Sequence, residues 1–416
     1  MSAIATLLEL STNTAPNEWV SEYQESILVR NAKGMNNGAS LFGLMSRLKN
    51  EPAETTEYRW FERDPVTREV FSVGAGTTVT ATGLDFSLTQ AGSENVSGLL
   101  QPGTVLLAVT GGATPTNEGE MIRIDSQQAG PTYSVTRGFA GTTADTLTDD
   151  TKWVIVTLGK GEGASPVSSV YENPSTLVNY IQTFNSAVAI SNAFKGSKLR
   201  TDIQGPLRER RVQALERIAR DIELAYLLGE SFAPNDPNPG GQYFTGGIKE
   251  AVDSIGASPA QFLDDTSGTV AGEVTLNAVQ TWTESFMTVG SENKLLMAGP
   301  GVYAMFSNYA ASATNGFRIT GQENIFGMNI ISVLTPFGIL DMALHPLLKE
   351  ITALNDWGFV VDLSLISQKV MEPLFLEPNI QLPGDDSYKE QFRAKSGLKL
   401  KFAEAFAYVK GVNTIV

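Results

Sequence analysis

One stretch of the chain, residues 175–229, constrains the fold more than any other. It joins an extended segment to a long, charged helix that we expect over Pro206–Leu228. Apolar side chains recur there at alternating three- and four-residue steps, so they would stack on one helical face. Pro206 suits the first helical turn, and Gly229 stands where a left-handed C-cap would fall. The predicted core-facing stripe consists of Val212, Leu215, Ala219, Ile222 and Tyr226, widened by Ile218 and Ala225.

Charged side chains occupy the rest of the predicted helix surface. Glu216 and Arg220 are spaced for an i,i+4 pair that would contribute about 0.2–0.5 kcal/mol. A surface with both charge signs is either simply solvated or paired with neighbouring subunits, and the residues leave both interpretations open. The predicted polar face carries Arg208, Glu209, Arg217, Arg220, Asp221 and Glu223. The candidate structural and assembly residues are therefore Val212, Leu215, Ile218, Ile222, Arg220, Asp221 and Glu223.

Composition excludes several classes of function. The chain has 416 residues, 42% of them hydrophobic, which predicts two or three domains with real cores. Its net charge of −15 argues against a protein that binds phosphate backbones by counterion release. Cysteine is absent, which excludes disulfides and Cys-metal sites. The N-terminus lacks a basic segment, and no apolar run approaches the roughly 20 residues of a membrane span, so we expect a soluble protein made in a cytoplasm.

The chain changes character several times along its length. Residues 1–54 contain short apolar pieces between Gly and Asn, which favours either a flexible tail or an arm that orders against neighbouring subunits. Glu57–Phe61 alternates like a strand. Residues 76–158 are rich in Gly and Thr with short predicted strands, typical of a small sandwich or barrel. Helices are expected at 278–289 and 302–309, and strands at 294–298, 328–333, 338–342, 362–370 and 399–409.

Motifs that carry chemistry are weak. Gly299–Ala304 matches G-x-G-x-x-A between a predicted strand and helix, but Pro300 removes an N–H and no acidic residue follows the next strand, so a strand-to-helix turn is favoured over a nucleotide site. The single histidine, His345, reads as a structural loop residue, because a triad or metal site needs partners. Asp264-Asp265 and Asp385-Asp386 read as polar turns. No catalytic residue, cofactor or metal ligand is predicted.

Three short motifs, in a fixed order, resemble one family. Asn179-Tyr-Ile-Gln-Thr-Phe184, Val188-Ala-Ile-Ser191 and Arg220-Asp-Ile-Glu223 are similar to a branch of the tailed-phage major capsid proteins, whose Hong-Kong-ninety-seven-type fold is shared with encapsulins. The resemblance extends in outline from about Glu57 to the C-terminus. Val135–Thr143 resembles a segment found in β-domains inserted into such proteins, where its glycines would serve a tight turn.

The resemblance implies an α+β fold with an extended hairpin called the E-loop, a peripheral P-domain with a long spine helix, and a central A-domain. The implied boundaries are an N-terminal arm at 1–54, the E-loop at 55–75 and 159–198, an inserted all-β domain at 76–158, the P-domain at 199–270 and 356–416, and the A-domain at 271–355.

The implied function is a major capsid protein that self-assembles, as hexamers and pentamers, into the icosahedral head shell around the double-stranded DNA of a tailed phage. It would be assembled in the host cytoplasm, with a portal as partner and with scaffold or decoration proteins where the shell needs them. The alternatives are an encapsulin-like compartment and a soluble nucleotide-dependent enzyme that uses the Gly299–Ala304 turn. Large particles would favour a shell over an enzyme.

Overall fold

The computed structural model describes residues 50–63, 68–73, 83–88, 96, 99–109, 119–128, 130–144, 151–163, 174–196, 206–234, 241–255, 262–264, 273–311, 318–325, 328–412 and 414–415. The expected N-terminal arm therefore lies almost entirely outside the described residues. The chain divides into two units. Residues 61–177 form one, and residues 1–60 together with 178–416 form the other.

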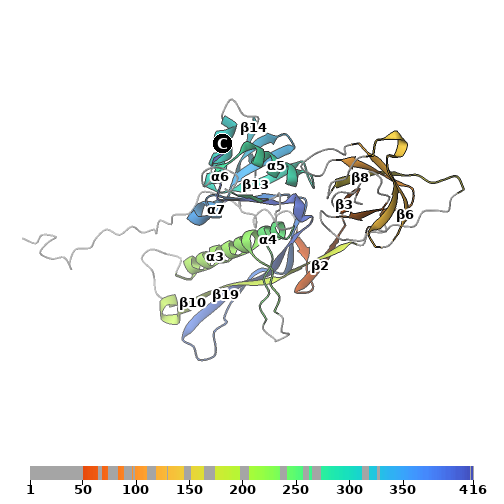
Figure 1. Ribbon diagram of the computed structural model, residues 1–416. Helices are drawn as coiled ribbons and strands as arrows, with labels where there is room; N and C mark the ends of the chain where they lie inside the picture. The colour runs from red at the N-terminus through yellow and green to blue at the C-terminus, as the bar shows by residue number, and fades with distance from the viewer. Residues whose placement is uncertain are drawn as a thin grey trace, which may run out of the picture. The chain divides into compact units, whose positions relative to one another are not determined.

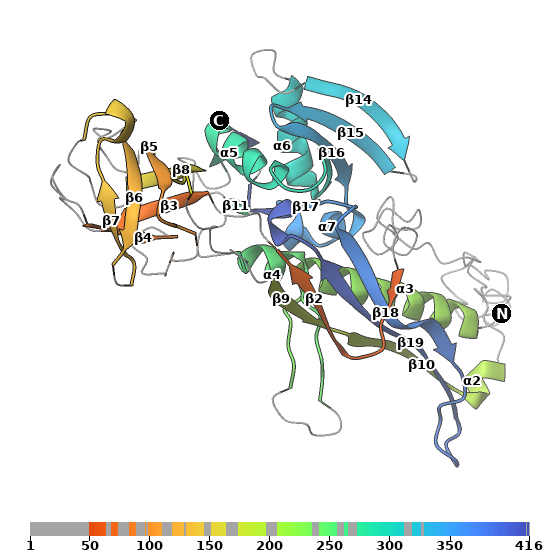
Figure 2. The ribbon, with the colours of Figure 1, turned by 90° about the vertical axis from the view of Figure 1, so that its right-hand side faces the viewer.

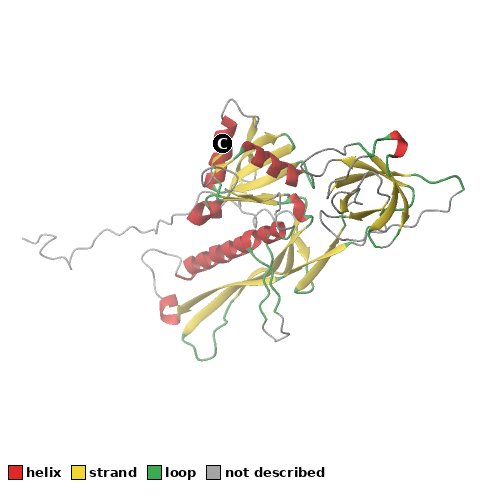
Figure 3. Cartoon of the chain, viewed as in Figure 1, coloured by secondary structure: helices red, strands yellow, loops and turns green. Residues whose placement is uncertain are grey.

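The smaller unit contains a closed barrel of short strands, seen as yellow arrows in Figure 3. Its strand order is β3-β4-β7-β6-β5-β8, with antiparallel pairing between neighbours. Inward-pointing side chains such as Phe86, Tyr133 and Trp153 fill the interior and pack edge to face. The strands are β3 (Glu69–Val73), β4 (Gly83–Ser87), β5 (Thr104–Val109), β6 (Met121–Gln127), β7 (Thr132–Thr136) and β8 (Thr151–Leu158).

The barrel agrees with the sandwich or barrel expected from composition, but it begins earlier. Strand β3 precedes residue 76 and pairs with both β4 and β8. The expected boundary at residue 76 rested on a change to Gly- and Thr-rich composition, and β3 lies before that change. A two-stranded ribbon of β2 (Glu57–Glu62) and β9 (Ser175–Tyr180) carries the chain into and out of this unit.

The larger unit begins with a four-stranded sheet in the order β1-β18-β19-β10. Figure 2 shows the long strands β10, β18 and β19 side by side. Helix α3 (Pro206–Leu228) spans the expected range and lies along β10 and β19 (Figure 1). The strands are β1 (Asn50–Pro52), β10 (Gln182–Ser191), β18 (Ile366–Glu377) and β19 (Ser387–Leu400), with α2 (Asn192–Gly196) after β10 and α4 (Ile248–Asp253) after α3.

A seven-stranded mixed sheet forms the rest of this unit, in the order β11-β20-β17-β13-β16-β15-β14. Helices α5 (Leu276–Met287) and α6 (Pro300–Ala311) flank it. The strands are β11 (Phe262–Asp264), β13 (Asn293–Ala298), β14 (Arg318–Ile325), β15 (Met328–Thr335), β16 (Gly338–Leu344), β17 (Trp357–Val361) and β20 (Ala407–Lys410). The shorter elements are β12 (Glu273–Val274), β21 (Thr414–Ile415), α7 (Pro346–Glu350) and the 3-10 turns Phe139–Gly141, Thr352–Leu354 and Ala403–Ala405.

Two hydrophobic cores hold the larger unit together. One joins α3 to β10, β19 and one face of β13 and β17, so that α3 lies between the two sheets. The other joins the opposite face of β13 to α5 and α6. Strand β13 is buried on both faces, which is why Leu295–Ala298 is apolar throughout. Trp282, Phe286 and Phe306 are buried in this second core.

Two predicted strands have different bounds in the structure. Residues 362–365 are a turn rather than part of the strand expected at 362–370, because the Asp362 carboxylate accepts hydrogen bonds from the backbone N–H groups of Ser291 and Ser364. The segment 399–409 is divided between β19, a 3-10 turn and β20. The break falls at Phe402, whose φ of 54° is left-handed and ends the extended run.

Candidate assembly surfaces

Helix α3 buries a different stripe from the one predicted. Ile218 and Ile222 are fully buried as expected, and Ala214 lies with them in the core. Val212 and Leu215, however, are 50% and 44% exposed, so the prediction that they face the core is wrong. In the N-terminal half of the helix the side that packs on the core carries Leu207 and Ala214, and Val212 and Leu215 lie outside it.

The C-terminal half of α3 is covered by the segment around α7. Glu223 was expected on the polar face, but it is buried and its carboxylate lies 2.8 Å from His345 Nε2. His345 Nδ1 accepts a 3.5 Å bond from the Leu348 backbone N–H as the N-cap of α7. His345 is therefore structural, as expected, and Glu223 belongs to the subunit interior rather than to a solvated face.

The other two charged candidates behave as surface groups. Arg220 Nη2 lies 3.3 Å from Glu350 at the end of α7, and both side chains are more than a third exposed. Exposed pairs of this kind contribute about 0–1 kcal/mol. Asp221 is exposed. Within the Arg220–Glu223 motif, therefore, Ile222 and Glu223 hold the fold, while Arg220 and Asp221 remain accessible to a neighbour.

The first motif of the sequence is also structural. Asn179 is buried, and its side-chain amide donates to the carbonyl oxygens of Leu398 and Gly246 at 2.8 and 3.1 Å. Its carbonyl oxygen accepts from the N–H groups of Gly246 and Tyr180. One side chain thus ties together the end of β9, the end of β19 and the segment after α3. Phe184, at the end of the motif, packs edge to face on Tyr226 of α3.

Sequence reasoning missed the ion pair that locks α3 to the sheet. Arg211 Nε and Nη2 donate to the two carboxylate oxygens of Glu390 on β19 at 2.6 and 2.7 Å. Burial alone would raise the pKa of Glu390, but the Arg211 and Tyr388 bonds hold that pKa below its usual value. Because 179 positions separate the two residues, no local pattern could have paired them.

A buried lysine was also missed. Lys294 on β13 donates to the carbonyl oxygens of Val289 and Ala405 at 2.7 and 2.8 Å and lies 3.7 Å from Asp362. Burial lowers the pKa of Lys294 to about 8 despite this carboxylate. The cluster fastens the loop after α5 to the sheet. The polar side chains of this cluster bond to backbone groups and are buried from solvent. The cluster therefore stabilises the fold and is not a reaction centre.

The Gly299–Ala304 turn is filled by the chain itself. A Cβ on Gly299 would collide with the Asn355 carbonyl oxygen, and one on Gly301 would collide with the Asp356 carboxylate. The N–H of Gly301 donates to Asn355 O at 3.0 Å. The space and the donors that a pyrophosphate would need are therefore occupied. Among the described residues, no group of three or more His, Cys, Asp or Glu side chains could hold a metal ion.

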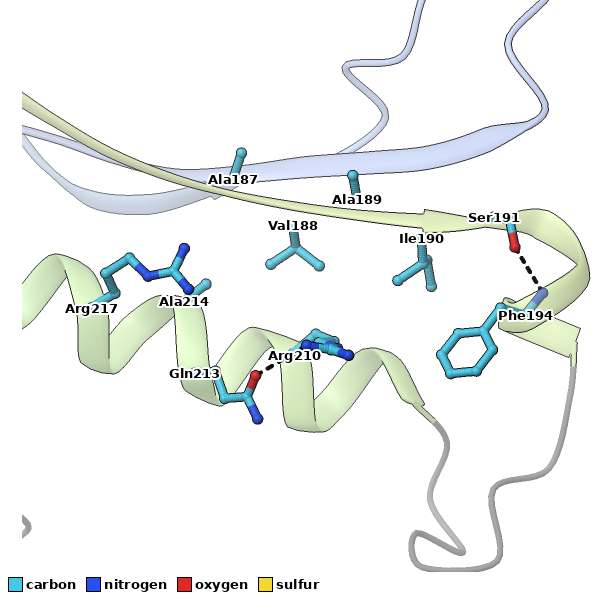
Figure 4. A pocket seen from close by; sticks show the side chains of 10 residues that line it. All are labelled: Ala187, Val188, Ala189, Ile190, Ser191, Phe194, Arg210, Gln213, Ala214 and Arg217. Carbon is cyan, nitrogen blue, oxygen red and sulfur yellow. Dashed lines mark hydrogen bonds between the residues drawn. The ribbon is translucent and has the colours of Figure 1, made fainter. Parts of the chain in front are cut away.

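A groove of about 510 Å³ opens beside α3 (Figure 4). Val188 and Ile190 point from β10 toward the helix and form an apolar floor with Ala214. Phe194 of α2 lies at one end. Gln213 lines the groove from α3, as do the exposed side chains of Arg210 and Arg217. The groove is a candidate docking surface because it combines apolar and cationic groups at the edge of the sheet.

The other face of the four-stranded sheet carries a ladder of charges. Lys395 pairs with Glu372 at 2.8 Å, and Glu51 of β1 pairs with Lys369 at 2.8 Å and with Lys399 at 3.3 Å. The bond from Lys369 and the charge of Lys399 lower the pKa of Glu51 to about 2. This carboxylate therefore helps to hold β1, the strand that follows the N-terminal segment, on β18.

Replacing Glu51 with Gln tests this attachment through its pH dependence. The folded-state pKa of about 2 lies below the ordinary value of 4.5, so the stabilisation is fully present above pH 4.5 and disappears as the pH falls toward 2. At pH 6 the wild-type chain should have a higher Tm than Glu51→Gln, with a free energy of unfolding larger by about 1 kcal/mol, as for a partly exposed pair. The two Tm values should converge near pH 2. A difference that does not vary with pH would contradict the role of Glu51.

Comparison with known proteins assigns the chain to a family. The model of the SU10 major capsid protein family matches residues 40–413. No curated protein matches the chain. No helix of the described residues is long and apolar enough to cross a membrane.

Several solved structures match the chain over most of its length. The SrpI encapsulin of Synechococcus elongatus PCC 7942 has 10% identity and a TM-score of 0.45 over 98% of this chain and 97% of that one. A Mycobacterium phage Ogopogo structure has 12% identity and a TM-score of 0.45 over 96% and 99%. The satellite phage P4 procapsid has 11% identity and a TM-score of 0.38 over 100% and 99%.

These structural likenesses are too weak to carry the assignment, which rests on the family match. That match covers the spine helix, both sheets and the barrel alike, and it confirms the resemblance carried by the three short motifs. The chain belongs to the SU10 major capsid protein family and is a phage capsid shell protein.

Proposed function

We propose that the chain self-assembles as hexamers and pentamers into the icosahedral head shell that encloses the double-stranded DNA of a tailed phage. The family match over residues 40–413 carries this proposal. The exposed apolar residues Val212 and Leu215 support it, because a rigid helix that leaves apolar side chains uncovered is suited to contact another subunit. With a net charge of −15, the wall would enclose the genome without binding its sequence.

The proposal assigns a role to each part of the chain. Residues 1–54 act as an arm on neighbouring subunits, and 55–75 with 159–198 form the E-loop, whose tip carries the β-rich insertion of 76–158. Residues 199–270 and 356–416 form the P-domain, and 271–355 the A-domain. The β2–β9 ribbon, which leads the chain to the barrel and back, supports the E-loop assignment. Assembly takes place in the host cytoplasm, with a portal and, where the shell needs them, scaffold or decoration proteins.

The first test is electron microscopy of the expressed chain. We expect closed particles in the megadalton range, because every subunit repeats the same contacts around a shell. An encapsulin-like compartment would also give particles, but an encapsulin would enclose protein cargo, whereas a phage head from an infected cell encloses DNA. A chain that remains a small oligomer under all conditions would contradict the proposal.

Deleting residues 1–49 tests the arm separately from the subunit. β1 begins at Asn50 and stays in place, with its Glu51 bridges. Ordering an arm costs about 1–2 kcal/mol of backbone entropy per residue, so its order must come from contacts with other surfaces. The truncated chain should melt within a few degrees of wild type yet form few or no shells by light scattering. Normal shells from the truncated chain would show that assembly does not need the arm. An unfolded subunit would show that the arm belongs to the core of its own subunit.

A further inference from the structure

The hairpin between β18 and β19 ends in a tip that its own chain leaves uncovered. Leu382 in this tip is 72% exposed, and Ile380 beside it is 36% exposed. The tip segment, residues 378–386, also carries Asp385 and Asp386. Asp385 pairs with Lys389 of β19 at 2.8 Å, so Asp386 is the tip carboxylate that forms no ion pair among the described residues.

The tip is held in one conformation before it meets any partner. The N–H of Ile380 donates to Lys389 O at 3.0 Å, and the N–H of Asp385 donates to Leu382 O at 3.1 Å. The amide of Asn192, at the start of α2, donates to the Asp386 carboxylate at 2.8 Å. Asn379 and Gly384 have positive φ angles, which fix the two bends of the loop. Because the tip is already ordered, binding it to another surface costs little conformational entropy.

The groove beside α3 has the complementary character. Its floor is apolar, and its rim carries Arg210 and Arg217. Among the described residues, neither arginine forms an ion pair with an acidic side chain, and Arg210 donates to the side-chain oxygen of Gln213 at 3.4 Å. Its volume of about 510 Å³ accommodates two aliphatic side chains.

We propose that the β18–β19 tip of one subunit inserts into the α3–β10 groove of a second copy of the chain, with Leu382 and Ile380 on the apolar floor and Asp386 facing Arg217. The Asp386 carboxylate meets the positively charged rim of the groove, which carries Arg210 and Arg217, so the contact is complementary in charge as well as in polarity. This inference rests on the proposed shell function and names one of its contacts.

Tip and groove are different surfaces of the same subunit, so the contact is head-to-tail. Every copy can offer its tip to one neighbour and its groove to another. Such contacts close into rings or continue from subunit to subunit, as a shell requires, whereas a self-complementary patch would stop at dimers. Covalent trapping can distinguish these two cases.

The absence of cysteine makes engineered disulfides unambiguous. We would introduce Leu382→Cys in the tip and Gln213→Cys in the groove, both at exposed positions. In oxidised assemblies the double variant should give a ladder of dimers, trimers and larger species on a non-reducing gel. Mixed single variants should give a heterodimer of tip and groove chains, which excludes a link within one chain. Shells that yield no heterodimer would overturn the inference.

Charge reversal gives a second measurement. Arg217→Glu and Asp386→Lys should each raise the protein concentration needed for assembly by about tenfold, as expected for loss of one important interface pair. Combining them should restore most of the assembly. Arg208→Glu, on the exposed surface of the same helix but outside the groove, is the matched control and should change little. Equal effects of Arg208→Glu and Arg217→Glu, or no rescue in the double variant, would contradict the contact.

The two proposals fail in different ways. Wild-type protein that never forms particles would contradict the shell function. Wild-type particles that form while the double-cysteine ladder is absent would contradict only the tip–groove contact.

Discussion

Replacing Ile222 with Asp is expected to unfold the subunit, whereas replacing Leu215 with Asp is expected to leave it folded. Both residues belong to the apolar stripe of one helix, yet Ile222 is fully buried between the two sheets and Leu215 is 44% exposed. A carboxylate at position 222 would have no partner in the core and would also lose the packing of Ile, costing about 4 kcal/mol or more. At position 215 it would remain hydrated, with an effect within about 1 kcal/mol.

Circular dichroism melts of the two variants measure this difference directly. Ile222→Asp should be insoluble or melt far below wild type, while Leu215→Asp should melt close to it. We also expect Leu215→Asp to lower the yield of particles, because Val212 and Leu215 form an uncovered apolar surface on the spine helix. Equal losses of stability in both variants would mean that the helix is rotated from the orientation described here.

The second large effect is expected in the barrel, from Glu120→Ala. The Glu120 carboxylate, just before β6, accepts two bonds from Arg137 at 2.6 and 2.7 Å, and the two side chains are 1% and 6% exposed. Removing one member of a buried pair leaves the other charge without compensation and costs about 3–5 kcal/mol. The same carboxylate accepts the N–H of Gly138, whose φ of 59° begins the turn after β7. The variant should therefore loosen both the barrel and this turn.

Hydrogen exchange with mass spectrometry can localise that loss within the full chain. Peptides from the barrel strands should lose protection in Glu120→Ala, while peptides from α3 and β19 should not. Asp125→Ala is the matched control, because Asp125 also pairs with an arginine, Arg123, but both side chains are about a third or more exposed. That variant should cost no more than about 1 kcal/mol. Equal loss of protection in both variants would show that burial does not govern the Glu120–Arg137 pair.

The sequence by itself determined the elements whose information is local. The apolar spacing and Pro206 predicted the bounds of α3, since a helix depends on neighbours three and four positions apart. The helix ends before Gly229 as expected, but Gly229 does not have the left-handed φ predicted for a C-cap. Alternating β-rich segments between 105 and 156 predicted short strands, and these close into a barrel. Three short motifs were enough to identify the family. The glycine motif at 299 was correctly read as a turn because its own neighbours lacked the groups that a nucleotide needs.

Only the tertiary structure decided which residues are covered. Val212 and Ile222 are both aliphatic residues of the same predicted stripe. Ile222 lies where other parts of the chain cover the helix, and Val212 lies where they do not. Glu223 looks like a surface charge, yet His345, 122 positions away, buries it. Arg211 and Glu390 are 179 positions apart. Burial and long-range pairing depend on how distant segments pack, and the hydrophobic pattern of one helix cannot specify what, if anything, lies opposite each of its faces.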